Sequence, residues 1–207
     1  HMMKFMILWE NMAMGSSADK LVNVVGPYWI EHYFKDDRYL KVDGRPVLGW
    51  LSLDYYLEGC GNDYEVAKKG LNDFKQLCID AGVGEPIYVF SAIESDPAYY
   101  EKYKELGIEV IQPYGAATGA ILSQDRFIKL VGNAVDEAGL TFAPTFGSGV
   151  DGRAWNAASM GYVPNEMFRQ FLENYRDDFL KNADKSKLMW NYAVFDTYDE
   201  IGEGHYI

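Results

Sequence analysis

Six short strand-like runs alternate with five amphipathic helical stretches along almost the whole chain. The strand-like runs are at 4–9, 46–51, 86–92, 108–114, 141–146 and 187–196. The helical stretches are at 17–35, 63–81, 97–106, 123–138 and 164–182. Alternation of this kind predicts parallel strands joined by crossover helices, and therefore an α/β protein. Two architectures share the pattern: an open doubly wound sheet, and all or part of a (β/α)8 barrel.

The predicted helices carry start and stop signals. Asn62 and Ser123 are of the residue types that cap helix N-termini, and each stands just before a helical stretch. Gly82, Gly107 and Gly139 stand just after one, where a glycine commonly ends a helix in the left-handed conformation. These five positions set the predicted helix boundaries.

The composition fits one globular domain. A chain of 207 residues that is 48% hydrophobic and 24% charged can bury a full core and is not of the disordered type. No linker or break in composition divides it, so residues 3–207 are predicted to form a single domain. His1 and Met2 are interpreted as a vector remnant ahead of Met3.

The charge and hydropathy narrow the range of partners. A formal net charge of −12 weighs against nucleic acid and anionic membranes. No apolar run approaches the roughly 18 residues that a membrane span needs. The run "KFMILW" (4–9) is too short for the apolar core of a secretory signal, so any targeting segment is expected upstream of this sequence. A neutral carbohydrate is compatible with such a surface.

Metal, disulfide and nucleotide chemistry have little support in the sequence. Cys60 lies in a turn and Cys78 on the apolar stripe of a predicted helix, so we expect free thiols. The motif "GSGVDG" (147–152) formally matches the dinucleotide fingerprint, but no apolar helix pattern follows its third glycine. Apart from the vector residue, the chain has only two histidines, His32 and His205. We therefore predict no metal site and no cofactor.

Side chains that can take part in catalysis or ligand binding follow the end of every predicted strand. They are Glu10, Asn11, Asp54, Tyr55, Glu94, Tyr114, Asp151, Arg153, Trp155, Glu200 and Glu203. Taken singly, a residue of this kind is more often a helix cap or a solvated loop residue than a ligand. In both candidate architectures, however, ligands bind beyond the carboxyl ends of the strands. The shared position of these residues therefore predicts a site at that end.

Because metal, thiol and nucleotide chemistry have little support, the functional groups of such a site are expected to be carboxylates and aromatic rings. Glycoside hydrolysis needs a proton donor for the leaving oxygen and a second carboxylate as nucleophile or base. Glu200 and Glu203 have a fitting E-x-x-E spacing, but spacing alone does not single them out among 31 acidic residues. The rings that are candidates for stacking on sugar faces are Trp9, Tyr114, Trp155 and Tyr198. Most other aromatic residues are expected to pack in the core.

Two segments resemble glycoside hydrolase family 99-like (WbsX-type) proteins most specifically. The segment "YFKDDRYLKVDGRPVLGWLS" (33–52) closely resembles a family segment that reads roughly "yF.d.rYlkvdGkPvl.iy". The closing "YDEIGEGHYI" resembles "WNEWxEGxyieP" in that family. There Glu200, Glu203 and Gly204 match, while Asp199 and Ile201 replace an asparagine and a tryptophan.

Two further segments extend the resemblance, in order, over nearly the whole chain. "KFMILWEN" is similar to a family strand that ends in Trp-Ala-Asn, which matches Trp9 and Asn11 but not Glu10. "FAPTFGSGVDGRAW" looks like a Pro-Thr strand followed by a Gly-Trp-Asp and Arg-Pro turn. The paired residues are Pro144, Thr145, Gly149, Asp151 and Arg153, with Val150 in place of the tryptophan.

The resemblance implies a (β/α)8 barrel and an endo-acting α-mannosidase-like activity that retains anomeric configuration. It assigns Glu200 as the base toward the sugar 2-hydroxyl, whose oxygen attacks C1 to give a 1,2-anhydro intermediate. It assigns Glu203 as the acid that protonates the leaving oxygen and later activates water. Two close carboxylates suit this division, because their repulsion keeps one protonated near neutral pH. Around them, the predicted substrate-binding residues are Trp9, Asn11, Tyr114, Asp151, Arg153, Trp155 and Tyr198.

Two other functions stay open at this point: glycosyl transfer in polysaccharide biosynthesis, and a non-catalytic glycan-binding barrel fragment. Only six of the eight strands of a barrel are predicted, so the barrel is expected to be incomplete. Its unpaired strand edges would favour self-association or opening into a flatter sheet. If the chain is a bacterial hydrolase, we expect it in the periplasm or at the cell surface.

Overall fold

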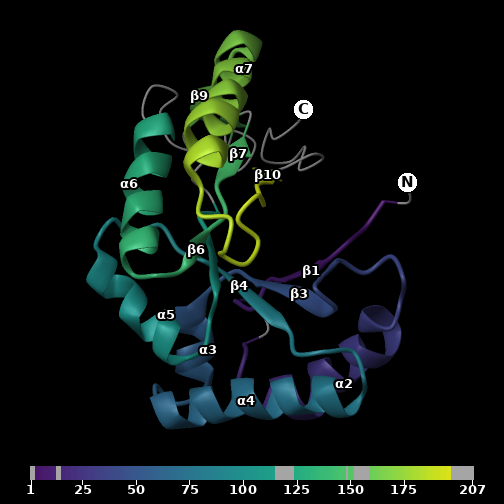
Figure 1. The fold of residues 1–207 in the computed structure, drawn as a ribbon. Helices are drawn as coiled ribbons and strands as arrows, with labels where there is room; N and C mark the ends of the chain where they lie inside the picture. Colours follow the sequence, from purple (N-terminus) through teal and green to yellow (C-terminus); the bar gives the residue numbers. More distant parts are fainter. Residues whose placement is uncertain (1–2, 13–14, 115–123, 148, 152–158, 197–207) are drawn as a thin grey trace. The chain divides into compact units, whose positions relative to one another are not determined.

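The structure is a computed structural model that describes residues 3–12, 15–114, 124–147, 149–151 and 159–196 (Figure 1). The chain divides into two compact units. The first comprises residues 1–91 and 101–110, and the second comprises residues 92–100 and 111–207. The single domain expected for residues 3–207 stays a prediction.

Three parallel strands form the centre of the first unit. They are β1 (Ile7–Trp9), β3 (Arg45–Trp50) and β4 (Ile87–Ser91), in the order β1-β3-β4. Strand β2 (Lys41–Val42) pairs antiparallel with β3 through a turn at Asp43 and Gly44. Both turn residues have positive φ, at 50° and 78°, and Asp-Gly is a preferred sequence there because both residues tolerate that conformation.

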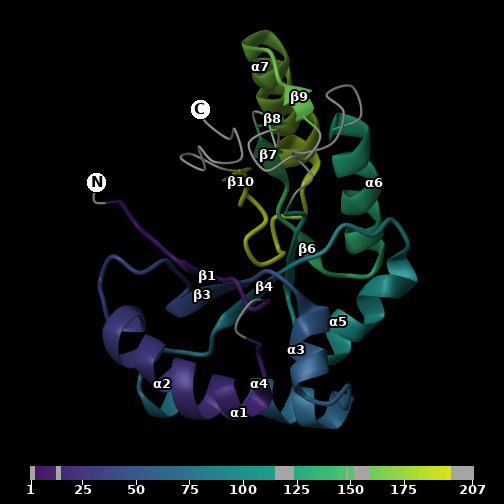
Figure 2. The same cartoon turned by 180° about the vertical axis from the view of Figure 1, so that it is seen from behind.

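Helices cover one face of these strands. The first helix runs from Ala18 to Phe34 as α1 (Ala18–Lys20), η1 (Leu21–Val25), α2 (Gly26–Trp29) and η2 (Ile30–Phe34). The others are α3 (Leu53–Gly59), α4 (Tyr64–Asp80) and α5 (Glu101–Glu105). Figure 2 shows α1, α2 and α4 side by side, and Trp29 and Phe34 of the first helix both contact Phe74 of α4. Their apolar faces thus meet beneath the sheet.

An aromatic cluster fills the space between the sheet and these helices. Trp50, which is fully buried, lies 4.9 Å from the ring of Phe90 in a stacked arrangement, and 5.2 Å from the ring of Tyr56. The hydroxyls of Tyr56 and Tyr88 donate hydrogen bonds to the carbonyl oxygens of Ala67 and Leu71 in α4. Because parallel strands place aligned residues on the same face, this cluster follows directly from the strand register.

Ion pairs hold the amino ends of the strands in the first unit. The Arg45 guanidinium, at the start of β3, contacts both carboxylate oxygens of Glu109 at 3.0 and 2.5 Å. It also donates to the Glu85 carbonyl at 3.1 Å, and the Glu85 side chain pairs with Lys75 at 2.9 Å. In a barrel-type fold this end serves stability, and the opposite end carries the chemistry.

Strand β1 is the last strand of its sheet among the described residues. Its flank carries exposed apolar side chains: Met3 is 89% exposed, Phe5 37% and Leu8 42%. An apolar edge of this kind is a template for strand pairing between copies. We propose that the chain self-associates through this edge.

A charge on the edge is expected to weaken that association. Leu8→Lys should shift the molar mass measured by light scattering toward the monomer, because an edge lysine disfavours strand pairing. Ile79→Lys, at an exposed position of α4, is the matched control and should leave the mass unchanged. A strict monomer before any substitution would contradict the expectation.

The second unit continues the strand and helix alternation. Its strands are β5 (Val110–Gln112, of which Val110 belongs to the first unit), β6 (Thr141–Phe142), β7 (Thr145–Gly147), β8 (Gly149–Asp151), β9 (Ser159–Tyr162) and β10 (Val194–Asp196). Its helices are η3 (Pro97–Tyr100), α6 (Gln124–Glu137), α7 (Asn165–Asn174) and η7 (Tyr175–Leu180). Strand β6 neighbours β5, and β10 pairs parallel with β7. Helix α6 packs on β6 and α7 on β7.

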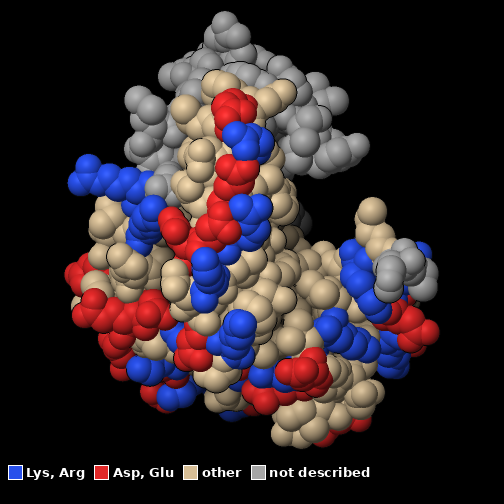
Figure 3. Space-filling view, turned by 45° about the horizontal axis from the view of Figure 1, so that its top comes forward, with Lys and Arg blue, Asp and Glu red and all other residues tan. Residues whose placement is uncertain are grey.

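The exposed face of α7 and η7 carries charges of both signs. Arg169 pairs with Glu166 and Glu173, one turn before and after it, and Arg176 pairs with Asp177. Figure 3 shows acidic and basic side chains alternating along this helix. Such pairs between exposed residues contribute little to stability, and they leave no block of one charge for a charged partner.

The helix boundaries follow the sequence closely. Gly82, Gly107 and Gly139 have φ values of 72°, 74° and 81°, which confirms them as helix-ending residues. The predicted cap Asn62 is wrong by one residue: Asp63 caps α4, and its side chain accepts hydrogen bonds from two backbone N–H groups of the first turn. The predicted cap Ser123 lies outside the described residues.

The structure differs from the predicted elements in several places. The run predicted as a strand at 187–196 forms turns until Val194, with Met189 at a positive φ of 55°. The short helix α3 and the antiparallel pair β8–β9 were not predicted.

No helix among the described residues is long and apolar enough to cross a membrane.

Candidate active site

Trp9, at the end of β1, packs into the aromatic cluster of the first unit. Its ring lies 4.7 Å from that of Trp50 and 5.1 Å from that of Trp29 in α2. The next residue, Glu10, is exposed, and its carboxylate accepts a hydrogen bond from the backbone nitrogen of Met12 at 3.1 Å. The structure therefore places the Trp9 ring between sheet and helix, and its sugar contact stays a prediction.

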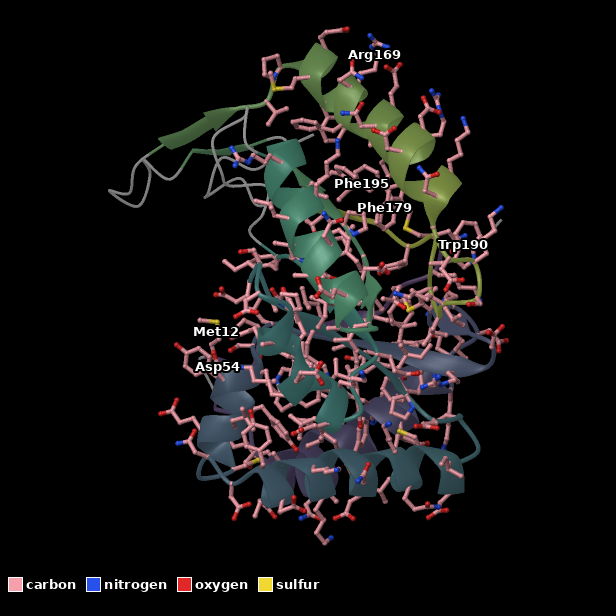
Figure 4. All side chains as sticks on the ribbon, turned by 60° about the vertical axis from the view of Figure 1, so that its left-hand side comes forward. Met12, Asp54, Arg169, Phe179, Trp190 and Phe195 are labelled. Carbon is pink, nitrogen blue, oxygen red and sulfur yellow. The ribbon has the colours of Figure 1, made fainter. Side chains whose placement is uncertain are left out.

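Asn11 joins the carboxyl ends of β1 and β3. Its amide nitrogen donates to the Ser52 carbonyl (2.7 Å) and to the Ser16 hydroxyl (3.0 Å). Its amide oxygen accepts from the Ser52 backbone nitrogen at 2.9 Å, and the side chain is fully buried. Ser52 also caps α3, so its hydrogen bonds with Asn11 fix the end of β1 relative to the start of α3. Figure 4 labels Met12 and Asp54, which follow these two strand ends.

Removing this link is expected to destabilise the first unit. Asn11→Ala should lower the free energy of unfolding by about 1–3 kcal/mol, because partners of a lost buried hydrogen bond stay unsatisfied. Urea denaturation measures the change. Asn72→Ala, which removes an exposed amide on α4, is the control and should change little. An Asn11→Ala variant of unchanged stability that binds sugar poorly would instead assign Asn11 to ligand contact.

Two predicted site segments follow strand ends of the second unit. The register of β7 and β10 aligns Gly147 with Asp196, so the chain leaves both strands at neighbouring positions. Asp151 ends β8, shortly after β7, and the segment with Glu200 and Glu203 begins directly after β10. This places the starts of both segments at one edge of the unit.

Other polar groups lie along the same run of strands. Tyr114 follows β5 and is half-buried, and Gln112, at the end of β5, is buried. The hydroxyl of Thr145 in β7 is fully buried and has no hydrogen-bond partner among the described residues. A buried polar group of this kind calls for an explanation and is suited to a ligand or water contact.

Several predicted site residues lie outside the described residues, and their placement stays a prediction. They are Arg153, Trp155, Tyr198, Glu200 and Glu203. The described residues place Trp9 and Asn11 together in the first unit, and Tyr114 and Asp151 in the second.

Sequence reasoning missed Ser16 and Ser52, the partners of Asn11. Ser52 is of a residue type that caps helices, but the helix that it caps, α3, was not predicted either. Ser16 is five positions from Asn11 and belongs to no sequence pattern that marks it as a partner.

The described cysteines and histidine offer no alternative chemistry. Cys60 and Cys78 are both free and buried, whereas burial was expected only for Cys78, and it raises the pKa of the Cys78 thiol to about 12. His32 is exposed on η2 with its ring 4.3 Å from that of Tyr28. No group of metal-binding side chains occurs within the described part of the chain. The segment 149–151 of the rejected nucleotide motif is a strand, not the start of a helix.

No family model matches this sequence, and no curated protein matches it. Among solved structures, the chain is similar to the GH99 endo-α-mannosidase from Bacteroides thetaiotaomicron. The TM-score is 0.53 at 13% sequence identity, over 88% of this chain and 50% of that one. The complex of the GH99 endo-α-mannosidase from this organism with bis-tris-propane matches with a TM-score of 0.49 at 14% identity, over 88% and 52% of the two chains.

The first of these similarities confirms the predicted fold class. The chain has an α/β fold with a parallel-strand sheet and covering helices, similar to part of a (β/α)8 barrel. It spans about half of the length of the solved structures that it matches. The fold of a glycoside hydrolase is thereby supported, while the WbsX-type subgroup stays a prediction.

Proposed function

We propose that the chain belongs to an endo-acting, retaining α-glycosidase of the mannosidase type, which cleaves a neutral polysaccharide or glycan. The observation that carries the proposal is the fold similarity to a GH99 endo-α-mannosidase over 88% of this chain. The parallel pairing of β7 and β10 supports it, because the two segments with candidate carboxylates leave from neighbouring strand ends.

In the proposed reaction, Glu200 removes the proton from the sugar 2-hydroxyl. The oxygen attacks C1 while Glu203 protonates the leaving oxygen, so the glycosidic bond breaks and a 1,2-anhydro sugar forms. Glu203 then takes a proton from water, which attacks C1 and opens the anhydro ring, while Glu200 returns its proton to the 2-hydroxyl. Two inversions at C1 give retention, and both carboxyl groups end in their starting states.

The predicted substrate-binding residues of the second unit would bind the sugar, and the sugar contacts of Trp9 and Asn11 in the first unit stay predictions. The aromatic rings of Tyr114, Trp155 and Tyr198 are proposed to stack on sugar faces, and Asp151 and Arg153 to hydrogen-bond the hydroxyls. A neutral substrate suits a protein with a net charge of −12, because no substrate charge is repelled.

Incubation with α-linked mannans tests the proposal. Hydrolysis releases new reducing ends, and proton NMR of the first product reports whether the α-configuration is retained. Transfer of the glycosyl group to an added alcohol, with little hydrolysis, would favour the glycosyl-transfer alternative. Saturable binding in calorimetry without any product would favour a glycan-binding module. The absence of both binding and product would overturn the proposal.

A further inference from the structure

A cavity of about 460 Å³ lies within the second unit, between α6 and the α7–η7 helix and over β6 and β7. Its aromatic lining consists of Phe142, Phe146, Phe171, Tyr175, Phe179 and Trp190. Cavities of this size with mainly apolar walls are typical of small-molecule sites. Of the predicted sugar-site residues, Trp9, Asn11 and Tyr114 have described side chains, and none of these three lines the cavity.

The aromatic walls are held in place by one another. The rings of Tyr175 and Phe179 stack at 5.3 Å with an interplanar angle of 22°. Phe142 presents its edge to Phe179 at 5.9 Å (Figure 4 labels Phe179), and the Tyr175 hydroxyl donates to the Tyr192 carbonyl at 3.3 Å. Tyr175 and Phe179 both lie on the π-helical turn η7, and such turns are frequent at functional sites. The walls are therefore preorganised for a flat ring.

Four of the five charged groups around the cavity form ion pairs with one another, and the fifth, Asp184, is hydrogen-bonded. Lys187 contacts Asp136, and the Lys129 nitrogen lies 3.9 Å from a carboxylate oxygen of Asp178. Asp184 accepts hydrogen bonds from the backbone nitrogen (2.9 Å) and the hydroxyl (2.6 Å) of the serine two positions on. An anionic ligand would lose its hydration here without gaining a free cationic partner, because both lysines are engaged, and that loss is costly. The cavity therefore favours a neutral ligand over an anionic one.

The uncharged polar side chains of the lining are partly engaged in hydrogen bonds within the protein. Asn174 accepts a hydrogen bond from Gln170 at 3.0 Å, and Asn182 donates to the Asp178 carbonyl at 2.6 Å. The side-chain amide of Asn133, exposed on α6, makes no hydrogen bond with the described residues. A free sugar, with hydroxyls on every side, would leave most of them unsatisfied between these rings. A ring compound with a single polar edge fits better.

We propose that this cavity binds an uncharged aromatic molecule, with its rings between the walls formed by Phe142, Phe179 and Trp190 and its polar group toward Asn133. This site goes beyond the proposed glycosidase function and does not depend on it.

A matched pair of fluorescent probes tests both the aromatic and the neutral character of the ligand. N-phenyl-1-naphthylamine is uncharged, whereas 8-anilino-1-naphthalenesulfonate has the same ring system with one sulfonate. The uncharged probe should bind saturably, with energy transfer from tryptophan that falls in Trp190→Phe. The sulfonated probe should bind more than about tenfold more weakly. Methyl α-mannoside should not displace the probe, and displacement by it would overturn the proposal in favour of a sugar site.

Filling the cavity separates a specific site from general surface binding. Ala183→Phe places a ring inside the lining and should weaken binding of the uncharged probe by about tenfold or more without lowering the melting temperature. Ala98→Phe, at an exposed alanine of η3, is the control and should bind like the unsubstituted chain. Asn133→Phe provides a second filling variant from α6. Equal binding by the filled variants and the control, or no saturable binding at all, would overturn the proposal.

Discussion

Glu203→Gln is expected to lower turnover of α-linked mannan by about 10²–10⁴-fold while ligand binding stays within a few-fold, because only proton transfer to the leaving oxygen is lost. The amide keeps the shape of the protonated carboxyl group and, like it, has an accepting oxygen and a donating group, but it cannot transfer a proton as an acid. Initial rates of reducing-end release, with calorimetric binding of the same oligosaccharide, measure the two quantities separately.

The partner variant distinguishes the two proposed roles. Glu200→Gln should be similarly damaging even for substrates with an activated leaving group, since these still need the 2-hydroxyl deprotonated. Glu203→Gln should recover part of its rate with such substrates, because their leaving oxygen needs less protonation. Glu137→Gln, at an exposed glutamate of α6, is the matched control. Unchanged rates in both site variants would show that the assignment is wrong.

Trp50→Ala is expected to give the largest loss of stability among single substitutions in the first unit, about 3–5 kcal/mol. The side chain is fully buried, and its ring contacts those of Trp9, Tyr56 and Phe90. Truncation would remove these contacts and leave a large cavity between the sheet and the helices. Denaturant unfolding followed by circular dichroism measures the change.

A smaller ring at the same position should cost much less. The indole nitrogen of Trp50 has no hydrogen-bond partner among the described residues, so Trp50→Phe removes an unsatisfied polar group while it keeps the stacking on Phe90. Tyr64→Ala, which truncates an exposed ring on α4, is the control and should change stability by about 0.5 kcal/mol or less. If both Trp50 variants lost the same stability, ring packing would not be the cause.

Much of the fold could be predicted from local sequence patterns. Helix α4 was predicted at 63–81 and is observed at Tyr64–Asp80, because its capping carboxylate, apolar stripe and terminal glycine all act within a few residues. The parallel arrangement of β1, β3 and β4 followed from the helices that separate them. The strand predicted at 187–196 failed over most of its length, since an apolar run does not reveal whether a neighbouring strand is present.

The sequence by itself determined that an α/β chain forms and that carboxylates and aromatic rings follow its strands, because these features depend on residue type and short-range periodicity. Only the tertiary structure decided how individual side chains are used. It packs Trp9 against Trp50 and Trp29, and it commits the amide of Asn11 to Ser16 and Ser52. It also opens the aromatic cavity beside η7. These outcomes depend on strand register and helix packing, which bring residues together that are distant in the sequence. Neither can be inferred from the sequence of a single segment.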